Sequence, residues 1–245
     1  MLWHYNSGDH SLTWRSYSLV RLLVIPGVHR LQALLLAHLL SDFAFQADWM
    51  VRAKQRGPSG VAPHITVVAG LTLLAVAPAL GQWWPAALFV VLTHAVIDIG
   101  KVTLDRRFSH YRLLLFYLDQ GLHVLVLVGA TLLVAGHLAA DPWNAPSVFW
   151  RVALDYSLVT FVLGILLRVS LPQQQFKNRW LGALERALFL TLPLLGLVAL
   201  ALGLLMAGVL WLAARREQRV GIWAETLVGD LIALLVGILL RAQLG

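Results

Sequence analysis

Residues 84–102 read WPAALFVVLTHAVIDIGKV, an apolar run of membrane-spanning length with His94 and Asp98 inside it. A transmembrane helix needs about 20 mostly apolar residues, and ionisable side chains within such a helix are costly and usually functional. The whole chain has the same character. Of its 245 residues, 59% are hydrophobic and 13% charged, whereas about a quarter are charged in ordinary soluble domains. We therefore predict an all-helical (all-α) integral membrane protein.

The sequence predicts a bundle of about seven transmembrane helices, over residues 31–50, 63–81, 84–102, 112–136, 148–171, 186–213 and 222–241. Within the sixth window we expect Pro193 to kink the helix without ending it. Residues 31–245 are expected to form one polytopic domain, with a four-helix half (31–136) and a three-helix half (148–241). Residues 1–30 are expected to be a leader that is either disordered or amphipathic and interfacial.

The Lys and Arg residues of the loops predict the orientation, because cytoplasmic loops are enriched in them. The first, third and fifth loops are basic, with Arg52 and Lys54 in the first, whereas the second loop has neither residue type. The N-terminus is therefore expected outside and the C-terminus in the cytoplasm. Two features disagree with this orientation. Arg215, Arg216 and Arg219 of the sixth loop would lie outside, and the leader carries Arg15, Arg21 and Arg30. The net charge of +7 fits cytoplasmic anchoring, and we expect no nucleic-acid partner.

Three histidine–aspartate pairs with four-residue spacing lie inside the predicted spans: His38–Asp42, His94–Asp98 and Asp119–His123. Residues four apart share one face of a helix. The order within the last pair is reversed, and its span also runs the opposite way through the membrane. All three histidines are thus expected in one layer and the three aspartates in another, nearer to the cytoplasm. His64, near the inner end of the second span, is expected to join them from below.

Imidazole and carboxylate groups together suit Zn, Mn or Fe as divalent ions. We predict a site for one or two such ions, with the ligands His38, Asp42, His64, His94, Asp98, Asp119 and His123. The candidate catalytic groups are Asp42, Asp98 and Asp119, together with Lys101 and Gln46 to orient a substrate. The chain has no cysteine, which excludes a thiolate zinc site and a cysteine nucleophile. Alternatively, each pair only stabilises helix packing as a buried polar contact.

A second group of ionisable residues lies late in the chain, at Glu185, Arg186, Glu225 and Asp230. An ion pair between Glu and Arg, within or between helices, is the simplest role for these residues, because a buried charge needs a partner.

The run His38-Leu-Leu-Ser-Asp42-Phe-Ala-Phe-Gln46, with the later His and Asp positions, resembles a bacterial integral membrane family known as domain of unknown function 3307. The stretches around Gly182 and Gly229 resemble its C-terminal half, so the resemblance covers residues 31–245. It implies a multi-pass protein of the bacterial inner (cytoplasmic) membrane. The family's name implies no activity.

Three functions remain open for the cluster. The first is a metal-dependent hydrolase that acts on a lipid or lipid-linked ester, amide or phosphate near the cytoplasmic leaflet. The second is a transporter of divalent metal or protons, and the third a structural or regulatory membrane protein. The hydrolase is favoured over the transporter, because the polar residues share one depth and the sequence lacks a convincing internal repeat. Membrane lipid is the expected partner, and the oligomeric state is left open.

Overall fold

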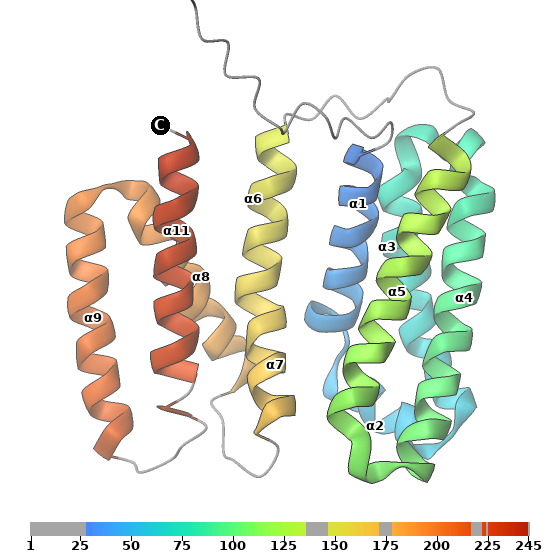
Figure 1. Cartoon of the computed structure of the whole chain (residues 1–245), viewed down its shortest axis with the longest axis horizontal. Coiled ribbons are helices and arrows are strands. Elements are labelled where there is room, and N and C mark those ends of the chain that lie inside the picture. The colour runs from blue at the N-terminus through green and yellow to red at the C-terminus, as the bar shows by residue number, and fades with distance from the viewer. Residues whose placement is uncertain (1–27, 136–146, 172–177, 217–221, 224, 245) are drawn as a thin grey trace, which may run out of the picture.

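The computed structural model describes residues 28–135, 147–171, 178–216, 222–223 and 225–244, and Figure 1 shows them as a set of helices. The α-helices are α1 (Val28–Leu39), α2 (Asp48–Arg56), α3 (Ala62–Val76), α4 (Leu80–Arg107), α5 (Arg112–Ala135), α6 (Ser147–Ser157), α7 (Leu163–Ser170), α8 (Arg179–Leu195), α9 (Leu197–Arg216) and α11 (Asp230–Leu244). Three π-helical segments adjoin them, η2 (Leu40–Ala44), η6 (Leu158–Val162) and η7 (Glu225–Gly229). Short 3-10 turns are η3 (Pro58–Val61), η4 (Ala77–Ala79) and η5 (Ser109–Tyr111). The predicted leader lies outside the described residues, apart from residues 28–30, which begin α1.

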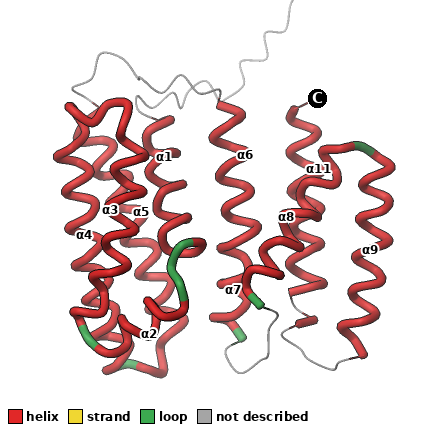
Figure 2. Tube along the Cα trace, turned by 180° about the vertical axis from the view of Figure 1, so that it is seen from behind, coloured by secondary structure: helices red, strands yellow, loops and turns green. Residues whose placement is uncertain are grey.

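The helices form two bundles that stand side by side, one made of α1 to α5 and the other of α6 to α11 (Figures 1 and 2). Helix α1 packs against α6 where the bundles meet. The first core consists of apolar side chains from α1, α3, α4 and α5, with Trp83 fully buried among Leu34, Val90 and Leu127. Small alanines on α4 and α5 let these helices approach closely, as is usual for helices packed in a membrane.

Four described stretches have the length and hydropathy to cross a membrane: Pro58–Arg107, Ser109–Val134, Val148–Ser170 and Glu225–Leu244. The first of them comprises α3 and α4, which lie side by side (Figure 1). Large apolar side chains on the outer faces are exposed, among them Val96, Leu125, Leu133 and Val198. Polar residues are buried inside the bundles, as lipid surroundings require. The all-helical class is confirmed for the described residues, and their composition suits a membrane.

The sixth predicted window, residues 186–213, is not one kinked helix. The structure divides it into α8 and α9, which meet at Gly196. Gly196 has φ of +130°, a backbone conformation that residues with a side chain rarely adopt. The Pro193 carbonyl accepts hydrogen bonds from the Gly196 N–H at 3.3 Å and from the Arg241 guanidinium at 2.8 Å, which satisfies the end of α8. A tight reversal therefore replaces the expected kink.

The additional helix changes the expected topology. The start of α1 and the end of α11 lie on the same face of the molecule, whereas the sequence predicted opposite faces (Figure 1). Helix α9 ends at Arg216 on the face that carries α2 (Figure 1). Arg215 and Arg216, at the end of α9, therefore lie at the same end of the molecule as the basic last turn of α4, whereas Arg219 lies outside the described residues.

Candidate metal centre

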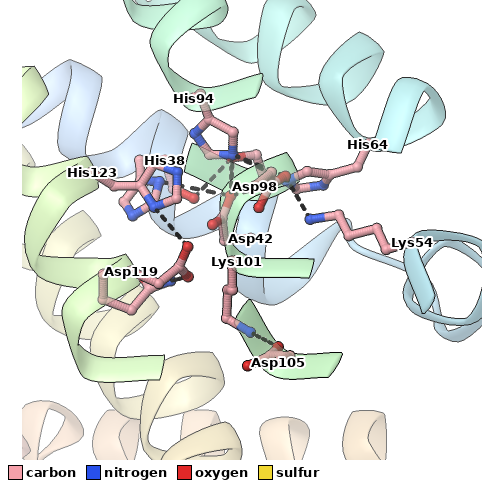
Figure 3. A network of polar contacts seen from close by, with 12 residues as sticks. His38, Asp42, Lys54, His64, His94, Asp98, Lys101, Asp105, Asp119 and His123 are labelled. Carbon is pink, nitrogen blue, oxygen red and sulfur yellow. Dashed lines mark hydrogen bonds and ion pairs between the residues drawn. The ribbon is translucent and has the colours of Figure 1, made fainter. Parts of the chain in front are cut away.

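All seven predicted ligands converge inside the first bundle (Figure 3). The α1–η2 segment carries His38 and Asp42, the first turn of α3 carries His64, α4 carries His94 and Asp98, and α5 carries Asp119 and His123. Each of these side chains is at most 8% exposed. The four-residue spacing places both members of each pair on the inward face of their helix, as the sequence indicated.

Four ligand atoms form the centre of this cluster. His64 Nε2 lies 3.2 Å from His94 Nε2. The same His64 atom lies 3.4 Å from Asp42 Oδ1 and 3.5 Å from Asp98 Oδ2. The corresponding distances from His94 Nε2 are 3.5 and 3.7 Å. Ligands placed about 2.0–2.1 Å from a tetrahedral Zn²⁺ stand about 3.4 Å apart, so either carboxylate oxygen has the spacing to share one coordination sphere with the two histidine nitrogens.

The other three residues flank this centre. The imidazole of His123 lies between two others, with ring centroids 4.0 Å from His94 and 5.0 Å from His38. His38 forms one candidate ligand group with Asp42 and His94. Asp119 and His123 form another group with Asp98. Within each group, the ligand atoms lie within 4.8 Å of one another. The cluster therefore offers donors for a second position beside the first.

Several buried atoms of the cluster lack a hydrogen-bond partner among the described residues. They are Nδ1 of His38, Nδ1 of His64, both ring nitrogens of His123 and Oδ1 of Asp119. Such atoms are rare and costly in a folded protein. If the cluster served only to join helices, direct hydrogen bonds would be expected, yet its histidine–carboxylate contacts are 3.4 Å or longer. Buried groups of this kind can hold a metal ion, and the donor set fits a divalent one.

Each of the three carboxylates also accepts a hydrogen bond from outside the ligand set. Asp98 accepts from Lys54 Nζ at 2.7 Å, Asp42 from Ser41 Oγ at 3.0 Å, and Asp119 from the Gln120 amide at 2.9 Å. Partners of this kind orient metal-binding carboxylates. The sequence did not assign Ser41 or the contact of Lys54, because only the fold of α2 brings Lys54 back to α4.

The carboxylates face a cavity of about 380 Å³ on the side of the cluster toward α2. Gln46 and Lys101, the predicted substrate-orienting residues, line this cavity and are not among the candidate ligands. Lys101 donates to Asp105 at 2.7 Å, one turn further along α4. On the opposite side, Leu34, Val90, Leu127 and neighbouring side chains leave a space of only about 10 Å³ beside the histidines. The cluster is therefore accessible from one side.

The late group of charges forms a separate buried network in the second bundle. Arg186 Nε donates to the carbonyls of Val159 and Thr160 at 3.0 and 3.1 Å, and Arg168 pairs with Glu225 at 2.6 Å. Asp230 is buried in the same bundle. Glu225 thus pairs with an arginine of another helix, but the arginine is Arg168, which lies outside the group predicted from the sequence.

Fold and site together define a helical protein of membrane-like composition with a buried histidine–aspartate cluster in its N-terminal half. Residues 31–146 match the model of the family described as "Protein of unknown function (DUF3307)". The matched range contains all seven candidate ligands, and it confirms the resemblance found in the sequence. The predicted extension of the resemblance to residue 245 lies beyond the match. No curated protein and no solved structure matches the chain.

Proposed function

We propose that this protein is a metal-dependent hydrolase of the bacterial inner membrane that cleaves an ester, amide or phosphate bond of a lipid or lipid-linked molecule. The observation that carries the proposal is the buried group of His64, His94 and Asp98, whose donor atoms have the spacing of one coordination sphere, with Asp98 at the wall of a cavity. Zn, Mn and Fe are the candidate ions, at one or two positions.

The charge distribution supports a cavity that faces the cytoplasm. Basic residues are concentrated on the face that carries α2, including Arg52 on α2, Arg106 and Arg107 at the end of α4, and Arg216 at the end of α9. Cytoplasmic ends of membrane helices are enriched in such residues. In this orientation, the start of α1 and the end of α11 both lie on the outer side, and the cluster opens toward the cytoplasmic leaflet.

When bound, a divalent ion activates a water molecule and polarises the bond to be cleaved. The carboxylate of Asp119 is placed to accept a proton, because its Oδ1 has no hydrogen-bond partner among the described residues while Gln120 fixes Oδ2. The Lys54 ammonium holds Asp98 in position. Lys101 and Gln46 border the cavity, where each can donate a hydrogen bond to a polar group of the substrate.

The alternative function, transport of a metal ion or protons, requires access from both sides of the membrane. Apolar side chains close the side of the cluster that lies away from α2, where the free space is only about 10 Å³. A transporter opens to each side in turn, and the apolar closed side offers an ion no polar path in this conformation, which favours an enzyme over a transporter.

The test compares the wild type with His94→Gln, since His94 belongs to two of the three candidate ligand groups. His110→Gln is the matched control, because His110 is exposed and lies outside the cluster. Elemental analysis of protein purified in mild detergent is expected to find Zn, Mn or Fe in the wild type and the control, and none in His94→Gln.

Lipid extracts incubated with the metal-loaded protein are then compared by mass spectrometry, and His94→Gln is expected to release no product. Metal uptake into proteoliposomes without lipid turnover would establish the transporter instead. A wild type that holds no metal after controlled reloading would exclude the hydrolase and metal transport, and would leave proton transport or a structural role.

A further inference from the structure

The cavity beside the cluster combines a basic end with an apolar wall. Among its described lining residues are five basic side chains, Lys54, Lys101, Arg112, Arg168 and Arg179, and five acidic ones, Asp42, Asp48, Asp98, Asp105 and Asp119. Three of the five acids are candidate metal ligands. A bound divalent ion therefore leaves the cavity with a net positive charge, and such a cavity attracts anions.

The basic residues are contributed by both bundles. Arg112 begins α5, whereas Arg168 lies in the last turn of α7 and Arg179 begins α8. Arg179 has a structural role, because its guanidinium donates hydrogen bonds to the backbone carbonyls of Gln46 and Ala44 at 2.7 and 2.8 Å. Arg112 is exposed, and the Arg168 side chain is 28% exposed, so both can contact a molecule in the cavity.

Part of the remaining wall is apolar. Phe43 and Phe116 line it from the first bundle, and Ile165 and Val169 line it from α7. The volume of about 380 Å³ is at the small end of the usual range for ligand pockets, which is about 300–1,000 Å³. It accommodates a polar head and the start of an acyl chain, while the rest of the chains remain in the surrounding lipid.

We propose that this cavity binds the phosphate group of a phospholipid, with Arg112, Arg168 and Lys101 as its cationic partners. Guanidinium and ammonium groups bind phosphate through charge-assisted hydrogen bonds, and an attached lipid accounts for the apolar part of the wall. This inference rests on the proposed function, because it names the substrate class of the same site. It also assigns a binding role to the C-terminal half through Arg168.

The experiment is native mass spectrometry of the full-length, metal-loaded protein released from detergent micelles. This measurement counts bound metal and bound lipid independently on the same molecule. Three probes are compared: phosphatidic acid, diacylglycerol with the same acyl chains but no phosphate, and inorganic phosphate. We expect bound phosphatidic acid and no bound diacylglycerol.

The variants are Arg112→Gln and Arg168→Gln, each expected to weaken phosphatidic acid binding about tenfold, the usual effect of losing one charge-assisted hydrogen bond. Arg107→Gln is the control. Arg107 is exposed at the end of α4, five residues before Arg112, and it does not line the cavity. If Arg168→Gln fails to fold after loss of its pair with Glu225, the exposed Arg112 still decides the result.

Equal binding of phosphatidic acid and diacylglycerol, or unchanged binding in Arg112→Gln, would overturn the phosphate site. Binding of inorganic phosphate but not of phosphatidic acid would overturn the claim that the bound phosphate belongs to a lipid. Arginine-dependent phosphatidic acid binding in a protein without metal would uphold this inference while the hydrolase proposal fails. Bound metal without arginine-dependent lipid binding would overturn this inference and leave the hydrolase proposal standing.

Discussion

Replacement of Asp98 by asparagine tests the metal centre most directly, because Asp98 belongs to two of the three candidate ligand groups. The change preserves the shape of the side chain, and the amide oxygen can still accept the hydrogen bond from Lys54, 2.7 Å away. Only the negative charge is lost. Loss of a partner outside the ligand shell costs about 10–100-fold in metal affinity, so loss of a ligand charge is expected to cost at least about 100-fold.

Asp105→Asn is the matched control for this change. Asp105 lies on the same helix, accepts a 2.7 Å hydrogen bond from Lys101 and lines the same cavity, but it belongs to none of the ligand groups. Metal affinity is measured by competition with a chelator. The control should keep wild-type affinity. The reasoning is refuted if Asp98→Asn binds metal as tightly as Asp105→Asn does.

Thermal stability of the same two variants separates a metal site from simple helix packing. Asp98→Asn leaves the Lys54 ammonium without its paired carboxylate, and this costs up to about 3–5 kcal/mol whether or not the cluster binds metal. The response to added metal separates the two cases, because a cluster that only joins helices gains no stability from metal in any variant. If the cluster is a metal site, the wild type and Asp105→Asn gain about 2.7 kcal/mol at 100 times the dissociation constant, and Asp98→Asn does not.

Two further substitutions test the surroundings of the cluster and the second bundle. Ser41→Ala removes the 3.0 Å hydrogen bond to Asp42, and chelator competition should show about tenfold weaker metal binding without loss of folding. Gly164→Ala would place a methyl group 2.3 Å from the Arg186 guanidinium, and thermal unfolding should show a loss of about 1–3 kcal/mol. Gly129→Ala has no neighbouring atom within 4 Å and should be neutral or slightly stabilising in the same assay.

The candidate ligands could be found from the sequence because two independent patterns agreed. Loop charges gave the direction of the spans, and the reversed order in Asp119–His123 then placed its residues in the same layers as those of His38–Asp42. Ionisable residues in apolar helices give a strong signal, because lipid surroundings make an unneeded one costly. The four-residue periodicity within single helices was therefore sufficient to predict the candidate ligands.

The contacts of Lys54 and the cavity-lining arginines could not be predicted in the same way. Lys54 lies in a short polar helix whose direction depends on the turn after Asp42, and basic residues at helix ends usually act as membrane anchors. The break at Gly196 was missed because glycine is common within transmembrane helices, so it gives no stop signal in an apolar run. These features depend on tertiary contacts that local sequence does not specify.

Helix α8 connects the cluster with the second bundle through two arginines. Arg186 donates to carbonyls within η6, and Arg179 donates to the carbonyls of Ala44, the last residue of η2, and of Gln46, two residues later. A π-helical segment disturbs the regular backbone hydrogen bonds, and buried carbonyls need donors from elsewhere. Asp42 lies within η2, so the position of this ligand depends on an arginine that lies beyond the family match. The C-terminal half is therefore part of the structure that holds the candidate metal centre in place.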